Sequence, residues 1–289
     1  MRKRRLLPVL AFLWPAVLIP TSASAQAGRV MENQEFQSSA LDRAWNYTIY
    51  LPPGYETDQR AYPVVYLLHG YGGNHTNWVR LGDAAFTADS LTHIGELPPT
   101  IIVMPDGRNS WYVNSEPDGG FGAMETAMVE DLVGHVDATY RTIANRRGRM
   151  IAGLSMGGYG ALHLAFKYPD LFGAAASLSG AFSREEPERQ DLFSPAFGDP
   201  FDPDRWAAEN PFRFIQDVKA SGLRLPVYLT VGDDDGPWLY TGAVEFYRDL
   251  QEAEMPAELR ITDGAHTWAV WDTALAETLK FFSDVFRAR

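Results

Sequence analysis

The chain has 289 residues, a formal net charge of −12 and no cysteine. Such an acidic chain is poorly suited to nucleic acid or an anionic membrane surface, so neither is expected as a partner. Without cysteine there is no disulfide, no thiol nucleophile and no Cys-ligated zinc.

The first 25 residues have the pattern of a bacterial signal peptide. Residues 2–5 are basic, residues 6–20 are apolar, and Ala23-Ser24-Ala25 is an A-x-A cleavage signal; cleavage after Ala27 is an alternative. The apolar run is short for a membrane span and holds three prolines, so no stable membrane anchor is expected. We therefore expect export to the periplasm or the medium. Residues 26–289 would form one domain with a formal charge of −16, since four basic residues are removed.

Apolar runs alternate with helical patterns through the rest of the chain. Strands are expected at 45–50, 64–68, 100–104, 150–152, 174–178, 227–231 and 257–261, and helices at 124–140, 157–168, 243–253 and 273–286. Continuous apolar runs are typical of parallel strands buried on both faces. The alternation predicts an α/β fold with a mainly parallel central sheet and helices on both faces.

Ligands of such sheets bind at the carboxyl ends of the strands, so the segments after Leu68, Met104, Ala152 and Val231 should converge. Residues just past strand ends are candidates for contact with an acyl group or a sugar: Trp78, Asn109, Trp111, Tyr112 and Trp238. Residues 182–214 are rich in proline, aspartate and aromatic side chains. This segment is either a lid that builds a substrate pocket or a packed surface excursion.

The pentapeptide Gly153-Leu154-Ser155-Met156-Gly157 is the main chemical signal. It lies between an apolar run and a helix-forming run, and that order of strand, sharp turn and helix is typical of a nucleophile elbow. Glycines on either side of Ser155 avoid clashes and let the hydroxyl stand above the sheet. Ser155 is therefore the candidate nucleophile.

A serine nucleophile needs a base, and the base needs an orienting carboxylate. His266 is the one histidine of the six that follows both Ser155 and a later strand-end acid, as the order Ser, Asp or Glu, His requires. The acid should follow the strand at 227–231, where Asp233, Asp234 and Asp235 stand together. Spacing alone does not choose among these three.

Two N–H donors must stabilise the oxyanion of the tetrahedral intermediate. One should be the amide of Met156, which follows the nucleophile, and the other should come from the loop after an early strand. His69-Gly70-Tyr71-Gly72-Gly73 is in that place, and we assign the second donor to the Tyr71 amide. His69 is interpreted as a residue that orients this loop.

Together these motifs resemble the esterase D-like branch of the α/β-hydrolases. That branch includes carbohydrate esterase family 1 feruloyl and acetyl-xylan esterases, tributyrin esterases, S-formylglutathione hydrolases and mycolyltransferases. The matching pieces are residues 50–55, 67–74, 77–78, 104–107, 153–158, 232–235 and 264–266 with Trp271. The resemblance implies that Asp235 is the acid, and that the protein is a serine carboxylesterase needing no metal or cofactor. The implied substrates are short-chain, feruloyl or acetyl esters, including esters on sugars.

Two alternatives stay open on the sequence. The acyl-enzyme could pass its acyl group to a sugar acceptor, as the mycolyltransferase resemblance implies. The protein could also be an exported binding protein that has lost catalysis. The sequence does not give the natural acyl group or alcohol, or the oligomeric state.

Overall fold

The computed structural model describes residues 27–116 and 119–288, so the predicted signal peptide lies outside the described residues. A single eight-stranded sheet forms the centre, in the order β1-β2-β4-β3-β5-β6-β7-β8. The strands are β1 (Arg29–Ser38), β2 (Arg43–Leu51), β3 (Val64–Leu68), β4 (Ile101–Pro105), β5 (Arg149–Leu154), β6 (Ala174–Leu178), β7 (Val227–Gly232) and β8 (Ala257–Thr262). At one edge, β1 pairs antiparallel with β2, and β2 pairs antiparallel with β4. The six strands β3 to β8 run parallel to one another.

Helices and short turns connect the strands. They are α1 (Asn77–Arg80), α2 (Ala84–His93), α3 (Met124–Thr126), the π-helical turn η1 (Ala127–Leu132), α4 (Val133–Thr139), α5 (Met156–Lys167), η2 (Gln190–Leu192), α6 (Pro203–Glu209), η3 (Pro211–Phe214), α7 (Ile215–Ser221), α8 (Pro237–Glu252) and α9 (Trp268–Arg287). Among the described residues, no helix has both the length and the apolar character needed to cross a membrane.

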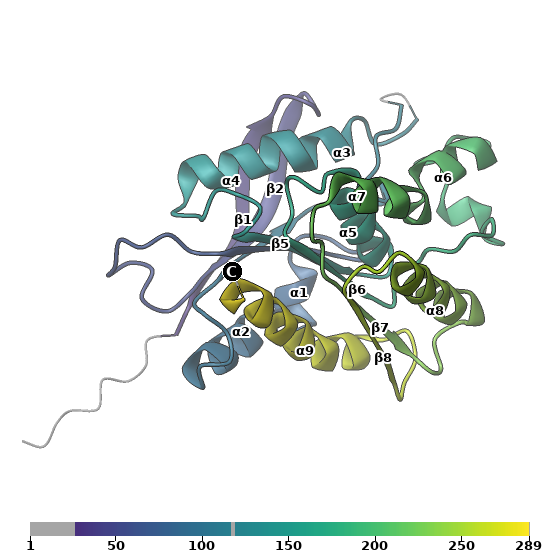
Figure 1. Cartoon of the computed structure of the whole chain (residues 1–289). Helices are drawn as coiled ribbons and strands as arrows, with labels where there is room; N and C mark the ends of the chain where they lie inside the picture. The colour runs from purple at the N-terminus through teal and green to yellow at the C-terminus, as the bar shows by residue number, and fades with distance from the viewer. Residues whose placement is uncertain (1–26, 117–118, 289) are drawn as a thin grey trace, which may run out of the picture.

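Helices cover both faces of the sheet (Figure 1). Val64, Tyr66 and Leu68 of β3 pack into the core shared with α4, α5 and α8, while Val65 and Leu67 pack into the core shared with α2 and α9. Neighbouring side chains of a strand point to opposite faces, so a strand covered on both sides must be apolar throughout. The expected three-layer α/β fold is confirmed.

Two helices begin earlier than predicted. α8 starts at Pro237, six residues before the predicted start, and α9 starts at Trp268, five residues before it. Proline is well suited to the first helical position, since the N–H that it lacks has no partner there. Both starts lie next to the segments that carry Asp235 and His266, so the helix N-termini help to fix those loops.

The prediction omitted β1 and α2. β1 is a ten-residue edge strand with alternately exposed side chains, and its polar sequence lacks the apolar run of a buried strand. α2 has a weakly apolar face, of which Ala84, Ala88 and Leu91 are buried. Their positions depend on β2 and α9, which the local pattern does not contain.

Candidate active site

Ser155 lies in a sharp turn between β5 and α5. Its backbone has φ 52° and ψ −119°, a region that side-chain-bearing residues rarely adopt. The turn is packed so closely that a Cβ on Gly153 would lie 2.3 Å from the carbonyl oxygen of Gly157. A Cβ on Gly157 would lie 2.5 Å from the carbonyl oxygen of Leu68. Glycine at both positions is therefore a steric requirement, and the strained turn presents the Ser155 hydroxyl at the end of the sheet.

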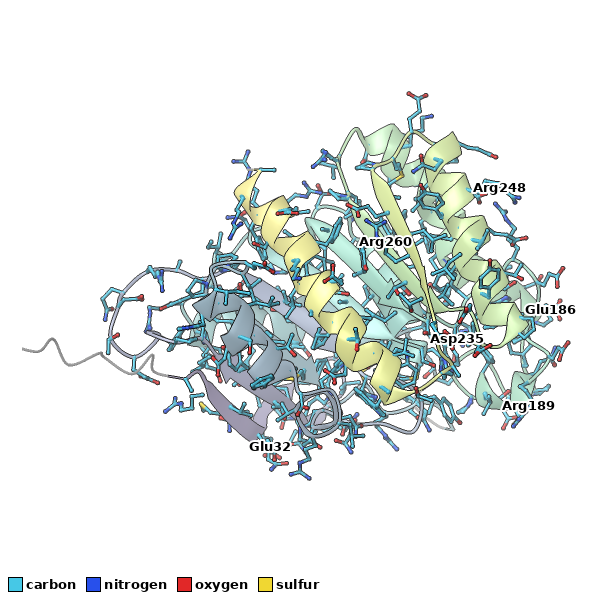
Figure 2. All side chains as sticks on the ribbon, turned by 90° about the horizontal axis from the view of Figure 1, so that it is seen from below. Glu32, Glu186, Arg189, Asp235, Arg248 and Arg260 are labelled. Atoms are coloured by element: carbon cyan, nitrogen blue, oxygen red, sulfur yellow. The ribbon has the colours of Figure 1, made fainter. Side chains whose placement is uncertain are left out.

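Three predicted residues form a hydrogen-bonded chain. His266 Nε2 lies 2.9 Å from Ser155 Oγ, and His266 Nδ1 lies 2.8 Å from Asp235 Oδ1. With Nδ1 donating to the carboxylate, Nε2 is left to accept the proton of the serine hydroxyl. Of the three candidate acids, Asp235 alone contacts this imidazole, whereas Asp233 and Asp234 are exposed. Figure 2 shows Asp235 at this end of the sheet, with Arg189 farther out.

Asp235 is buried and fully hydrogen-bonded. Its Oδ2 accepts from Ser179 Oγ at 2.6 Å and from the Gly232 amide at 2.9 Å, while Oδ1 faces His266. Burial alone would raise the pKa of this carboxyl, but the hydrogen bonds from His266, Ser179 and Gly232 outweigh it and hold the pKa below its usual value. Asp235 is therefore ionised at neutral pH and can stabilise a positive imidazole.

The sequence interpretation did not include Ser179 and Trp271 as a supporting pair. Trp271 Nε1 donates to Ser179 Oγ at 3.1 Å, and the Trp271 ring packs edge-on against His266 at 4.7 Å between centroids. The pair thus holds both the acid and the base. Ser179 directly follows β6. Its place just past the carboxyl end of a strand is a sequence signal that could have identified it.

The loop with Tyr71 lies beside Ser155. A Cβ on Gly70 would lie 3.3 Å from the Cβ of Ser155, and both residues line one cavity. The Met156 amide is at the first position of α5, where an N–H has no partner within its helix. The Tyr71 amide likewise donates no hydrogen bond to any of the described residues. Two N–H groups are thus available near Ser155 Oγ.

Two cavities meet at Ser155 and His266. The larger has a volume of about 430 Å³ and is mainly apolar, with Trp111, Phe193 and Trp238 in its wall. The smaller, of about 240 Å³, lies between the Tyr71 loop and the start of α9. Tyr71 lines both. The Ser155 hydroxyl therefore borders both an aromatic cavity and a smaller cavity.

Residues 182–214, the lid segment, combine both interpretations offered by the sequence. Leu192 and Phe193 line the larger cavity, and Phe193 stacks on Trp111 with ring centroids 4.0 Å apart. Trp206, deeper in the same segment, is buried among aromatic rings of the core. The lid segment therefore builds one wall of the pocket and packs the rest of itself into the core.

Two predicted substrate contacts are wrong. Trp78 is 1% exposed, and its Nε1 donates to the carbonyl of Leu68, so its ring belongs to the core beside α9. Tyr112 is fully buried, and its hydroxyl donates to the carbonyl of His69 at 3.1 Å. Both residues follow strand ends, but they support the backbone of the site from behind. Trp111 and Trp238 do line the larger cavity, and Asn109 Oδ1 accepts from the Gly72 amide.

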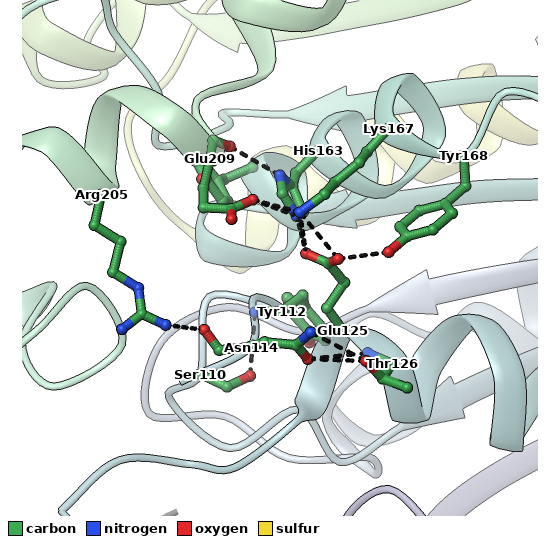
Figure 3. Close-up of polar contacts among 11 residues, drawn as sticks. Ser110, Tyr112, Asn114, Glu125, Thr126, His163, Lys167, Tyr168, Arg205 and Glu209 are labelled. Carbon is green, nitrogen blue, oxygen red and sulfur yellow. Dashed lines mark hydrogen bonds and ion pairs between the residues drawn. The ribbon is translucent and has the colours of Figure 1, made fainter. Parts of the chain in front are cut away.

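A partly buried ionic cluster attaches the lid segment to α5 (Figure 3). Lys167 Nζ lies 3.0 Å from Glu125 and 2.6 Å from Glu209 of the lid segment. His163 Nε2 lies 2.6 Å from Glu125 Oε2, and its Nδ1 lies 2.8 Å from the carbonyl of Glu209. Both imidazole nitrogens of His163 therefore face oxygen atoms. Lys167 and His163 of α5 together join Glu125 to Glu209 of the lid segment.

Two groups of side chains in the described chain could bring metal-ligand atoms within 4.8 Å: Glu125, His163 and Glu209, and the exposed Asp233, Asp234 and Asp263. In the first group the Lys167 ammonium already contacts both carboxylates, so the cluster supplies its own cation. In the second, Asp233 Oδ1 accepts from the Gly264 amide and braces the His266 loop.

An α/β-hydrolase sheet with a Ser-His-Asp chain at its carboxyl end is the architecture of a serine hydrolase. The family model described as "Putative esterase" matches residues 38–282, and the chain therefore belongs to this esterase family. "Esterase Rv1288" of Mycobacterium tuberculosis is 33% identical over 266 residues, covering 81% of this chain and 55% of that protein. "Acetyl esterase" of Caldicellulosiruptor saccharolyticus is 24% identical, covering 80% of this chain and 86% of that one.

Solved structures agree on the fold. A "ferulic acid esterase" superposes with a TM-score of 0.79 at 28% identity, covering 90% of this chain and 99% of that chain. Mycobacterium tuberculosis MPT51 superposes with a TM-score of 0.70 at 21% identity, covering 91% and 100%, which shows a shared fold. The chain spans about half the length of the mycobacterial esterase it matches. A match over 50% of this chain, at 33% identity, covers 21% of an "Endo-1,4-beta-xylanase/feruloyl esterase" of Xylanibacter ruminicola.

Proposed function

We propose that this protein is an exported serine carboxylesterase that hydrolyses acyl esters through an acyl-enzyme. The observation that carries the proposal is the continuous hydrogen-bonded chain from Ser155 Oγ through His266 to the buried Asp235. The aromatic cavity beside it supports an acyl group as the part of the substrate that is held. Export rests on the signal-peptide pattern of residues 1–25, and a single domain at 26–289 would carry the activity.

The mechanism follows from the contacts. Ser155 Oγ attacks the ester carbonyl carbon while His266 Nε2 takes the hydroxyl proton, and Asp235 stabilises the imidazolium. The amides of Tyr71 and Met156 donate to the oxyanion. The tetrahedral intermediate collapses, the C–O bond of the ester breaks, and His266 returns the proton to the leaving alcohol. Water then repeats the sequence on the acyl-enzyme and releases the acid. No step calls for a metal or a cofactor.

The substrate class is proposed from the cavity and the relatives. A chamber of about 430 Å³ walled by Trp111, Phe193 and Trp238 favours an apolar or aromatic acyl group. Relatives are named feruloyl esterase and acetyl esterase, so short-chain, feruloyl and acetyl esters, including those on sugars, are the substrates to test. The smaller cavity is left for the alcohol.

Acyl transfer to a sugar is the second candidate. The smaller cavity opens on Ser155 and His266 and could hold a sugar hydroxyl in place of water during deacylation. The partial match to "MPT51 antigen" of Mycobacterium leprae, 36% identical over 118 residues, is compatible with this second candidate function. Product analysis with trehalose or a xylooligosaccharide present would separate transfer from hydrolysis.

The deciding experiment compares the mature protein with Ser155→Ala. Hydrolysis of p-nitrophenyl acetate, p-nitrophenyl butyrate, methyl ferulate and acetylated xylan should occur with the first protein and vanish with the second. A fluorophosphonate should label only the first, since it reacts with an activated serine. Unchanged turnover by Ser155→Ala would refute the nucleophile. An unlabelled, inactive parent protein would favour the binding-protein alternative.

A further inference from the structure

The segment after β4 has an unusual backbone. Between Asp106 and Val113, three residues with side chains adopt positive φ: Arg108 at 49°, Trp111 at 56° and Tyr112 at 59°. Side-chain-bearing residues avoid this region, so their surroundings must hold the segment in place. Such local strain is often kept where it positions a functional group.

Three hydrogen bonds of this segment are made with the Tyr71 loop. The Gly107 amide donates to His69 Nε2 at 2.9 Å, and the Tyr112 hydroxyl donates to the His69 carbonyl at 3.1 Å. Both contacts are buried and hold the start of the loop. The third contact is at the far side, where Asn109 Oδ1 accepts from the Gly72 amide at 2.7 Å.

Besides this contact, one backbone hydrogen bond spans the turn, from the Gly73 amide to the Gly70 carbonyl at 3.0 Å. Gly72 is exposed with φ 73°, and a Cβ built on it would meet no atom within 4 Å. Packing at Gly72 therefore does not fix this turn. The Gly73–Gly70 hydrogen bond closes it, and the contact with Asn109 fixes the direction of the Gly72 N–H. Gly72 is the residue after Tyr71, so the direction of its N–H is coupled through the Tyr71 backbone dihedrals to the direction of the Tyr71 amide.

We propose that Asn109 is a positioning residue for oxyanion stabilisation: by holding the Gly72 N–H, it keeps the Tyr71 N–H aimed at the oxyanion. Asn109 itself touches neither the reacting atoms nor the hydroxyl of Ser155. The inference rests on the proposed function, because it needs an oxyanion to form at Ser155. It also replaces the prediction that Asn109 is a substrate contact.

The consequence is specific to the transition state. The oxyanion exists only after attack, so a misplaced Tyr71 amide should lower kcat and leave KM nearly unchanged. Complete loss of one oxyanion donor costs about 10²–10³ in kcat, and a donor that is loosened rather than removed should cost less, about 10-fold. The rate of fluorophosphonate labelling should fall in parallel, because phosphonylation of Ser155, with loss of fluoride, also places an oxygen in the oxyanion site.

The experiment compares Asn109→Ala and Asn109→Asp with Arg108→Asn as the matched control. Alanine removes the acceptor, aspartate keeps an acceptor oxygen in the same place, and Arg108→Asn changes the exposed neighbour to a residue that tolerates positive φ. A direct reading is the infrared carbonyl frequency of an acyl-enzyme made with a slowly hydrolysed ¹³C-labelled ester. Hydrogen bonds from the oxyanion donors lower that frequency.

We expect Asn109→Ala to raise the carbonyl frequency and lower kcat about 10-fold, with a Tm within about 3 °C of the parent, since only one exposed hydrogen bond is lost. Asn109→Asp and Arg108→Asn should keep the parent frequency and most of kcat. A parent-like frequency and kcat in Asn109→Ala would overturn the inference, as would an equal loss in Asn109→Asp. The proposed function would stand in either case, because it fails only if the parent is inactive or Ser155→Ala stays active.

Discussion

Replacing Glu125 by glutamine should weaken the attachment of the lid segment. Glu125 is 2% exposed and contacts His163, Lys167 and Tyr168. Burial would raise its pKa, but the contacts with His163, Tyr168 and Lys167 prevail and lower the pKa to about 2. Against the ordinary glutamate pKa of 4.5, this lowering of the pKa corresponds to about 3 kcal/mol of folding free energy. Glu125→Gln keeps the shape of the side chain and removes the charge.

The lowered pKa of Glu125 also predicts how the difference in stability between the parent and Glu125→Gln changes with pH. A carboxyl whose pKa is lowered on folding stabilises the protein fully above its unfolded value, and that contribution is lost as pH falls through the folded value. The parent should therefore be about 3 kcal/mol more stable than Glu125→Gln at pH 7. The difference should shrink below about pH 4.5, to roughly half near pH 3.

Urea unfolding at pH 7, 5 and 3.5 would measure this difference. Glu130→Gln is the matched control, because Glu130 is exposed on the neighbouring turn of the same helical segment. Its free energy of unfolding should change by less than about 0.5 kcal/mol. A Glu125→Gln loss that is equally large at pH 7 and pH 3.5, or no larger than that of Glu130→Gln, would refute the reasoning.

Two further predictions concern the acid and the elbow. Asp235→Asn should lower kcat about 10⁴-fold in an ester-hydrolysis assay, since asparagine cannot hold the required imidazole tautomer, whereas exposed Asp234→Asn should change it by less than about threefold; equal losses would remove Asp235 from its role. Gly157→Ala should cost about 3 kcal/mol or more in urea unfolding, because its Cβ would meet the Leu68 carbonyl at 2.5 Å. Gly134→Ala, in open space on α4, should instead stabilise by about 0.5–1 kcal/mol, and a tolerated Gly157→Ala would contradict the packing argument.

The central strands were predictable because burial on both faces requires a continuous apolar run, which can be recognised in the local sequence. The predicted bounds of β3 and β6 equal the observed Val64–Leu68 and Ala174–Leu178, since a strand covered on both faces must be apolar at every position. The edge strand β1 has no such requirement. Its sequence mixes polar and apolar residues, so no strand was predicted there.

In the site, too, some residues could be selected from the local sequence and others only from the folded structure. The motif around Ser155 and the chain order of acid and base carry enough local information to select Ser155 and His266. The choice of Asp235 needed either a family resemblance or the structure, because Asp233, Asp234 and Asp235 are equivalent by spacing. Only in the folded chain does one of them reach His266 Nδ1, at 2.8 Å.

Position after a strand end places a residue near the site but does not say which way its side chain points. Trp78 and Tyr112 turn into the core, Trp111 lines the aromatic cavity, and Asn109 reaches the Gly72 amide. The sequence by itself determined the layered α/β fold and selected Ser155 and His266 as the candidate nucleophile and base, since periodicity, a glycine-flanked turn and chain order can be read without the folded structure. The tertiary structure decided the acid, the pocket wall and the hydrogen bonds of the Tyr71 loop, because these depend on contacts between segments far apart in the chain.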